Sequence, residues 1–468
     1  MKNLHYKNII RIIFCFYLLI QAGCLVGPDY KPQDPNVPAG WVGTKNTASP
    51  DAMLLKWWTE FNDPNLTSLV ERAMKSNLDI RLAEEKIRQV RAIEGATSAG
   101  FWPTADITSS ATRNRNSAGV KSNLFQVGLD AAWELDIFGG TRRSIEAAKA
   151  DVNASIEDRR DVMVTLISEV ANNYVQLRGF QQEIIIARNN LKAQQQSAGV
   201  VRKRYEGGFV GALDVANADA QVATTMAQIP LFESSAQQTI YNISILLGQE
   251  PASLLEELSP SSPIPPMKPE IPVGLPSEVL RRRPDIRRAE AQIHSATAQI
   301  GVATADLFPK FNLAGSMAFS ATNQQSLKWD TRTWSFGPSA SWQIFNAGQV
   351  SYNIEAQKSL REQAVITYRK TVLTAIQEVE NALIAYTKEQ EHHKALIDSV
   401  TANRKAVEIS TQLYVEGQTE FLSVLDAQRS LYSAEDSLVQ SDRTLSTDLI
   451  ALYKALGGGW DIASPDSN

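Results

Sequence analysis

The fold is decided by the stretch from Met163 to Leu177, which reads MVTLISEVANNYVQL. Its apolar side chains recur at spacings of four, three, four and three residues, the pattern of a coiled-coil seam. The pattern returns further along the chain, displaced at every position by about 209 residues, which indicates an internal duplication. The two seams consist of Met163, Ile167, Val170, Tyr174 and Leu177, and of Val372, Ile376, Val379, Leu383 and Tyr386.

Composition narrows the possible functions. The chain has 468 residues and a net charge of −5, and because the neutralisation of phosphates needs clustered lysines and arginines, this weak acidity argues against a nucleic-acid partner, and none is expected. Four histidines and two cysteines leave little for a metal site, and neither a metal nor another cofactor is expected. No internal stretch of about 18 or more apolar residues occurs, so insertion into a membrane must use strands or a lipid.

The N-terminus resembles a targeting segment. Basic residues precede a short apolar run that ends in small residues before Cys24, which predicts a secretory signal peptide over residues 1–23. Ala22-Gly23-Cys24 resembles the lipobox of bacterial lipoproteins, although Gln21 stands where leucine is usual. That resemblance implies that Cys24 becomes the mature N-terminus and carries a diacylglycerol and an N-acyl chain such as palmitate. Residues 24–60, rich in proline and glycine, are expected to form an extended, lipid-anchored segment.

Residues 61–248 are predicted to form the first repeat. A helix is followed by a β-hairpin at about 101–137, in which apolar and polar residues alternate and aromatic residues stand at the ends. Strands of about ten residues with this alternation are typical of membrane-spanning hairpins, and a soluble hairpin is the alternative. A long helix at about 141–205 and a helix at about 213–247 complete the repeat.

The second half of the chain repeats this order after a proline-rich linker at 249–276. Its predicted parts are a second repeat at 277–458, made of a helix, a β-hairpin at about 308–345, a long helix at about 350–415 and a helix at about 419–457, and then a C-terminal tail at 459–468. Chance would rarely place two aromatic-rimmed hairpins at the same point of two helical repeats. The duplication therefore favours the membrane-spanning interpretation of both hairpins.

Four strands per chain cannot close a barrel. An open sheet in lipid leaves unpaired N–H and C=O groups at its edges, each costing several kcal/mol. The chain is therefore expected to oligomerise until a barrel closes. Two chains would give eight strands and a barrel filled by side chains, and three would give twelve and leave a lumen.

Several motifs carry a family resemblance. They are Gly27-Pro28-Asp29-Tyr30, Trp57-Trp58 with Phe61-Asn62-Asp63-Pro64, Arg281-Arg282-Arg283-Pro284-Asp285, Leu425-Asp426-Ala427-Gln428-Arg429 and Tyr453-Lys454-Ala455-Leu456-Gly457-Gly458-Gly459-Trp460. Through them, nearly all of the mature chain resembles the TolC-like outer-membrane factor family of tripartite, RND-type efflux systems, in particular its lipid-anchored OprM and NodT branch.

The resemblance implies the fold class of an α+β membrane protein. A homotrimer would form a twelve-stranded transmembrane β-barrel, with four strands from each chain, continued by a long periplasmic α-helical coiled-coil barrel. The chain would lie in the outer membrane of a Gram-negative cell, anchored by its lipid. Its partners would be outer-membrane lipid, a periplasmic adaptor (membrane fusion) protein and an inner-membrane, proton-driven RND-type transporter.

The function implied is that of a passive exit duct with a periplasmic gate, which exports small molecules such as drugs and toxic compounds. No catalytic motif occurs, and an enzyme is not expected. His392-His393 lies in a polar run without a third ligand nearby, so a metal site is not expected there. Two alternatives remain: a type I protein-secretion exit duct, and a structural periplasmic coiled-coil lipoprotein without a pore.

The same resemblance places the gate at the turn before the last helix. Leu422 would form an apolar constriction ring, and Asp426 would form an acidic ring just above it. The two lie four residues apart and so share a helix face. Tyr414 matches a family tyrosine whose hydroxyl helps to hold neighbouring coils together.

Two further residues are weaker candidates for the gate. Asp214 and Asn217 stand at the corresponding tip of the first repeat. Val415 and Thr419 occupy the positions where the family usually has an arginine, so the latch is expected to be less ionic here. The alternative is that Asp426 and Asp214 are simply acids favoured by the helix dipole near a helix N-terminus.

Overall fold

The computed structural model describes residues 25–34, 37–42, 54–265, 276–322 and 328–460. The predicted signal peptide, Cys24 and most of the predicted C-terminal tail lie outside these residues. The chain divides into two compact units, and each draws on both halves of the sequence. The first comprises 1–35, 85–157 and 287–371, and the second comprises 36–84, 158–286 and 372–468.

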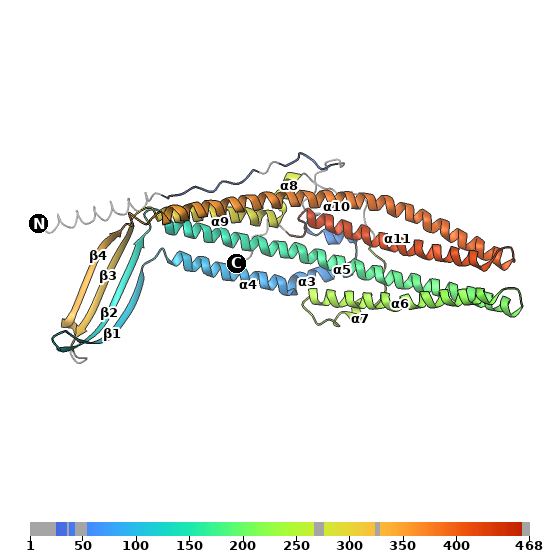
Figure 1. Ribbon diagram of the computed structural model, residues 1–468, viewed down its shortest axis with the longest axis horizontal. Helices are drawn as coiled ribbons and strands as arrows, with labels where there is room; N and C mark the ends of the chain where they lie inside the picture. The colour runs from blue at the N-terminus through green and yellow to red at the C-terminus, as the bar shows by residue number, and fades with distance from the viewer. Residues whose placement is uncertain (1–24, 35–36, 43–53, 266–275, 323–327, 461–468) are drawn as a thin grey trace. The chain divides into compact units, whose positions relative to one another are not determined.

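The first unit contains one antiparallel sheet in the order β1-β2-β3-β4 (Figure 1). Its strands are β1 (Thr104–Arg115), β2 (Lys121–Leu135), β3 (Lys310–Ala321) and β4 (Arg332–Ser341). The two hairpins join through β2 and β3, which pair from Phe125 opposite Ala321 to Leu135 opposite Phe311. The duplicated hairpins therefore build one continuous sheet rather than two separate ones.

The sheet has one apolar face and one polar face. Residues directly opposite one another in neighbouring strands point to the same side. By this register, Val127 and Phe319 share the apolar face, and Trp334, which is 75% exposed, lies on the same side. The other face carries polar pairs such as Thr108 Oγ1, which donates to Asp130 at 3.0 Å. Because these exposed apolar side chains form one continuous face, a partner or lipid is required to cover it.

Both outer edges of the sheet are open. Among the described residues, no strand pairs with the free edge of β1 or of β4. Pro338 lies in β4, and proline, which has no N–H, is tolerated in edge strands. Where β2 and β4 end and the chain continues toward the long helices, the indole N–H groups of Trp133 and Trp342 donate to the backbone carbonyls of Phe101 (2.9 Å) and Leu307 (3.1 Å).

The long helices start where the hairpins end. They are α5 (Gly140–Glu206) and α10 (Gln349–Val415), each of 67 residues and therefore about 100 Å long. Gly139 and Gly348 precede them with φ of +82° and +85°, a conformation that glycine adopts without strain. None of the helices in the described ranges combines the length and the apolar character needed to cross a lipid bilayer.

The first helix of each predicted repeat is divided in two. The pairs are α3 (Pro64–Ser76) with α4 (Leu78–Ala99), and α8 (Pro276–Arg282) with α9 (Pro284–Ala305). Asn77 separates the first pair, because its side chain accepts from the backbone N–H of Asp79 at 2.8 Å and so starts a new helix. Arg283 separates the second pair and donates to Asp285 at 2.6 Å.

The segment that follows Cys24 is extended, and it is held firmly against the first unit. Arg143, buried on α5, donates to Asp29 at 2.7 Å and to the carbonyl of Val26 at 3.1 Å. The ring of Tyr30 stacks on His294 of α9 with ring centres 4.4 Å apart. The predicted extended segment ends before residue 60, because Trp57–Phe61 form a 3-10 helix (η1) whose aromatic side chains are buried.

The core of the second unit is built on the duplicated seam. Ile167, Val170 and Tyr174 are buried there, and so are Val379 and Tyr386 of the second copy. They pack with η1, α3, α6 (Ala212–Leu246), α7 (Leu255–Leu258) and the C-terminal end of α11 (Phe421–Ala455). The seam thus forms the centre of this unit.

Candidate functional site

The candidate site lies in the second unit, at the turns that join α5 to α6 and α10 to α11 (Figure 1). The two turns have the same backbone. Gly208 and Gly417 have φ of +76° and +77°. In the first turn, the carbonyl of Arg204 accepts from the N–H of the residue after Gly208, and in the second, the carbonyl of Leu413 accepts from the N–H of the residue after Gly417, each at 2.9 Å. This is the Schellman end of a helix, which needs glycine at the left-handed position. The duplication therefore extends to the tips.

The two tips pack on each other through a small apolar cluster. The cluster combines residues of α5 and α6 with residues of the second helix pair, and it consists of Ala198, Val201, Ala218, Tyr414, Phe421, Val424 and Leu425. Tyr414, predicted from the sequence as a gate residue, is 4% exposed and lies at its centre. Its ring centre is 5.5 Å from that of Phe421.

An arginine of the first repeat holds Tyr414. The guanidinium of Arg204, at the end of α5, lies over the Tyr414 ring at 4.7 Å and donates to the Tyr414 backbone carbonyl. From the sequence, an arginine was expected beside the turn, where Val415 and Thr419 stand instead, and Arg204 on the other helix pair was not predicted. The available signal was position: Arg204 directly precedes Tyr205, which corresponds to Tyr414 in the duplication.

The hydroxyl of Tyr414 is left without a partner. Its Oη atom is buried and makes no hydrogen bond within the described part of the chain. Burial raises the pKa of this phenol, the positive charge of Arg204 opposes that shift, and the negative charge of Asp214 adds to it. The phenol therefore stays neutral and remains available as a donor to a group outside this chain.

Leu422 and Asp426 lie on α11 and face away from this cluster. Leu422 is 51% exposed, and the Asp426 carboxylate is open to solvent, with Arg429 at 3.9 Å as its nearest cation. Asn217 and Asp214 of the first repeat are half-buried. The structure thus places the Asp214 carboxylate near enough to Tyr414 to raise the pKa of its phenol, and it leaves Leu422 and Asp426 as exposed neighbours on one helix face.

Above the tips, α11 contacts α5 and α6 mainly through polar side chains. Gln428 donates to Ser197 at 2.9 Å, Arg429 to Gln221 at 2.8 Å and Tyr432 to Gln228 at 2.6 Å. We call these three contacts the polar ladder. Water can replace each such bond at modest cost, so the polar ladder can separate more readily than an apolar core.

Buried charges follow the polar ladder toward the base of α11. Glu183 of α5 faces Arg443 at 3.5 Å. Burial raises the pKa of Glu183 while Arg443 lowers it, and burial likewise raises the pKa of Asp436. Burial thus disfavours the ionised form of both carboxyl groups where α11 packs on α5.

Other polar clusters give no second site. His393 lies 2.6 Å from Asp442, and His392 lies 3.1 Å from Glu389. In the ranges that the structure describes, no group of three potential ligands that could hold a metal ion occurs. The histidines therefore pair with single carboxylates along the helices.

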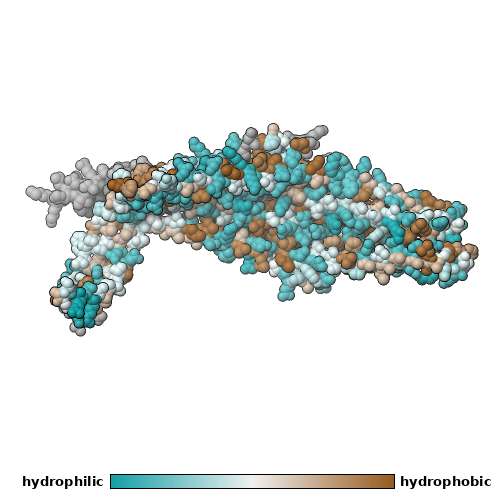
Figure 2. Space-filling view, in the orientation of Figure 1, coloured by the Kyte–Doolittle hydropathy of each residue, from teal (hydrophilic) through white to brown (hydrophobic). Residues whose placement is uncertain are grey.

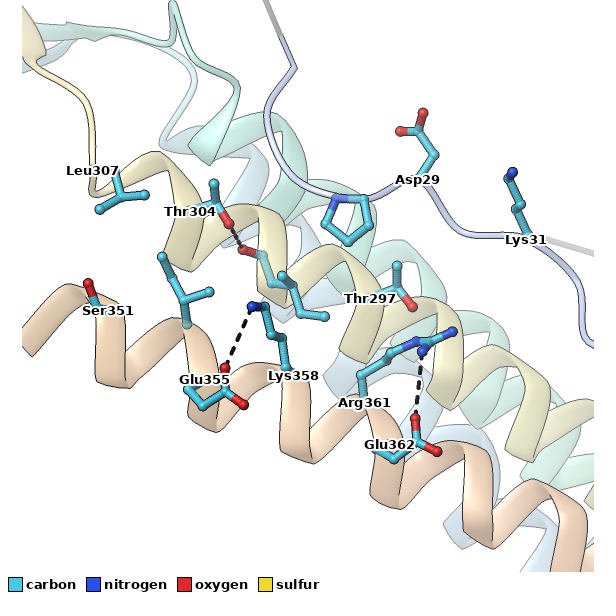
Figure 3. A pocket seen from close by; sticks show the side chains of 13 residues that line it. Asp29, Lys31, Thr297, Thr304, Leu307, Ser351, Glu355, Lys358, Arg361 and Glu362 are labelled. Carbon is cyan, nitrogen blue, oxygen red and sulfur yellow. Dashed lines mark hydrogen bonds and ion pairs between the residues drawn. The ribbon is translucent and has the colours of Figure 1, made fainter.

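The first unit has an open groove of about 980 Å³ beside α9 and α10 (Figure 3). Its acidic side chains are paired: Glu355 lies 3.6 Å from Lys358, and Glu362 lies 3.7 Å from Arg361. Asp29, on the opposite rim, is bound to Arg143. The remaining charged side chain is that of Lys31, and one exposed lysine does not make a ligand site.

Comparison with known proteins identifies what this arrangement resembles. The family model described as "Outer membrane efflux protein" matches residues 69–249 and 275–458. The chain is 32% identical to Nodulation protein T of Rhizobium leguminosarum bv. trifolii, over 95% of this chain and 97% of that protein. It is 32% identical to the pyoverdine export outer membrane protein OpmQ of Pseudomonas aeruginosa, over 97% of each. The solved outer-membrane channel OprN is 36% identical, with a TM-score of 0.87 over 93% of this chain and 100% of that one.

Proposed function

The chain belongs to the outer membrane efflux protein family, and from this premise we propose that it is the outer-membrane exit duct of a tripartite efflux pump. The resemblance predicted from the sequence motifs is confirmed, and so is the helix-rich fold class with its internal duplication and four-stranded sheet. The proposal is carried by one observation: an amphipathic sheet with two open edges is attached to two pairs of long helices.

Three copies of the chain would complete the structure. Joining the free edge of β1 to the free edge of β4 in a neighbour satisfies the unpaired backbone groups. Three sheets of four strands give twelve, enough to enclose a water-filled lumen lined by the polar face. Lipid would cover the apolar face. The duct itself supplies no energy, and we assign it no catalytic step.

The helix tips would form the gate of this duct. In a trimer, Leu422 and Asp426 of each chain would approach the axis and form an apolar ring and an acidic ring. Three like charges near an axis repel one another and attract cations. The family resemblance implied that the hydroxyl of Tyr414 helps to hold neighbouring coils together, and here this buried hydroxyl would donate to a neighbouring chain, while Arg204 fixes the ring within its own chain.

The proposed partners are a periplasmic adaptor and an inner-membrane RND-type transporter, the two other components that a tripartite pump requires. The relatives include a toluene efflux pump outer membrane protein of Pseudomonas putida, which is 32% identical. We place the adaptor contact at the tips, where Phe209 is 77% and Leu213 is 72% exposed. The substrates would be small molecules chosen by the transporter. Lipid on Cys24 would anchor the segment that Arg143 holds.

Purified protein in detergent tests this proposal. Light scattering should give the mass of three chains, and planar bilayers should show cation-preferring channels that are mostly closed. Asp426→Asn should reduce the cation preference. Asp219→Asn, which makes the same change at an exposed position of α6 away from the proposed acidic ring, should not. A monomer without conductance, even after Asp426→Asn, would refute the exit duct. Mass spectrometry of the N-terminal peptide, with Cys24→Ser as control, tests the lipid.

A further inference from the structure

The end of the sheet away from the helices carries a row of basic residues on its apolar face. Arg115 and Lys121 are direct cross-strand partners at the β1–β2 turn. Arg113 lies two residues before Arg115 in β1 and so points to the same face. Arg332 begins β4 opposite Phe319, which places it on that face as well. We call these four residues the basic rim.

The basic rim stands directly at the end of the apolar band. On the same face, Ile107 pairs with Leu129 and Val127 pairs with Phe319. Ile107 is 80% exposed, so the band is open to its surroundings up to the rim. Arg332 also lies over the Trp329 ring at 5.1 Å, and such aromatic residues are typical of the boundary between hydrocarbon and head groups.

Among the residues that the structure describes, three positive charges of the basic rim have no acidic partner. No carboxylate there forms an ion pair with Arg113, Arg115 or Lys121, and all three are exposed. The acidic residues of the strands, such as the cross-strand neighbours Asp106 and Asp130, lie on the opposite, polar face. Figure 2 shows hydrophilic residues gathered at this end of the sheet.

We propose that the basic rim binds the phosphate groups of the glycolipid of the outer leaflet, whose acyl chains then lie along the apolar band. This proposal rests on the proposed function, since it requires that the apolar face meets lipid. Guanidinium groups bind phosphate oxygens with two parallel hydrogen bonds. A soluble anion would satisfy the charges and leave the adjoining apolar band uncovered, whereas a phosphorylated lipid satisfies both.

The glycolipid is favoured over an ordinary phospholipid by the spacing of the charges. Arg113, Arg115 and Lys121 are adjacent on two paired strands, and Arg332 lies across the sheet on β4. A head group with two phosphates on linked sugars can reach several of these cations at once. A phospholipid with one phosphate reaches fewer, so its affinity should be lower.

Binding of defined lipids to the full chain in detergent tests the proposal. The probes are lipid A with two phosphates, its form without phosphate, and phosphatidylglycerol, and native mass spectrometry measures their binding to the trimer. The variant is Arg113→Gln with Arg115→Gln and Lys121→Gln. The matched control is Lys192→Gln with Lys370→Gln and Lys394→Gln, which removes three exposed charges from helices.

Wild-type protein should bind lipid A most tightly. Each basic residue near an anionic lipid surface contributes roughly a fivefold factor, so the rim variant should bind lipid A on the order of 100-fold more weakly. The helix control should bind like wild type, and raised salt should weaken binding. Equal affinity for lipid A with and without phosphate, or for lipid A and phosphatidylglycerol, would overturn the proposal, and neither comparison needs the variant to fold.

Conductance of the same samples separates this proposal from the exit duct. A rim variant that forms normal trimeric channels but loses lipid A would support the rim as a lipid site. Protein that binds lipid A through the rim but conducts nothing, even after Asp426→Asn, would support the lipid site and refute the duct. Channels with no preference for the phosphorylated lipid would refute the lipid site alone.

Discussion

Replacing Arg204 with glutamine should open the channel. The change removes a charge-assisted hydrogen bond to the Tyr414 carbonyl, worth about 1.5–3 kcal/mol, and a cation–π contact, worth about 0.5–1 kcal/mol. Because the guanidinium is half-exposed, we take the lower part of this range, about 2 kcal/mol per chain. That energy shifts the balance between closed and open tips by roughly 30-fold.

Single-channel recording in planar bilayers measures this shift as open probability. Arg202→Gln is the matched control, because Arg202 is on the same helix and its 2.8 Å pair with Asp219 is solvent-exposed and so contributes little. Arg204→Lys should restore the charge without the planar stack and give an intermediate result. The reasoning is wrong if Arg204→Gln and Arg202→Gln have the same open probability.

Tyr414→Phe separates the ring from the hydroxyl. The ring contacts with Arg204 and Phe421 remain, while the buried hydroxyl that has no partner among the described residues is lost. Within a single chain, this change should cost little. If Tyr414→Phe strongly raises the open probability, the hydroxyl makes a hydrogen bond to a neighbouring chain. If the open probability does not change, Arg204 is the residue that holds Tyr414 in the closed state.

Three further predictions concern stability, measured by thermal unfolding of the trimer. Gly208→Ala should destabilise by about 1 kcal/mol because φ is +76° with nothing near the new methyl group, whereas Gly199→Ala, equally uncrowded but inside α5, should stabilise by about 0.5–1 kcal/mol. The pKa values of Glu183 and Asp436 are raised in the folded chain. Their contribution to stability is therefore fully present below the pKa values of the unfolded state and is lost as the pH rises through the pKa values of the folded state. Glu183→Gln, which cannot ionise, should make stability depend less on pH and should raise stability at neutral pH. Asp63→Ala removes the cap of α3, in which the Asp63 carboxylate accepts from Asn65 N at 2.8 Å, and also the 2.6 Å hydrogen bond from the hydroxyl of Tyr174. The lost cap should destabilise by about 1–2 kcal/mol and the unpaired hydroxyl by about 1–3 kcal/mol more, while Asp79→Ala, which removes an acid that caps no helix, should have little effect.

The architecture could be predicted because its signals are local and repeated. A helix seam such as Ile167 to Tyr174 shows its period within a few turns, and the same period returns at Ile376 to Leu383. The strand alternation around Val127 is equally local. The duplication then served as an independent check on each interpretation, so the helices and hairpins followed without any long-range contact.

The contacts that hold the site together could not be predicted in this way. Arg204 contacts Tyr414 across 210 positions of sequence. Outside the site, in the first unit, the hydroxyl of Tyr30 likewise donates to Glu290 across 260 positions. Nothing in the spacing of residues indicates which helix pair packs beside which. The arginine that contacts Tyr414 is not near it in the sequence, because the equivalent turn of the other repeat supplies this positive charge.

The distribution of contacts along α11 explains how one helix can be both anchored and movable. Its C-terminal end is fixed: Tyr453 stacks on Trp57 at 5.2 Å, and Ile450 and Leu452 are fully buried in the core. Moving this end would expose apolar surface at about 25 cal/mol per Å². Toward the tip, the polar ladder replaces apolar packing, and each bond contributes only about 0.5–1.5 kcal/mol net because water can take its place. Opening should therefore pivot about the buried base, and it has to break the contacts that Arg204 and the apolar cluster make with Tyr414 at the tip, where the displacement is largest.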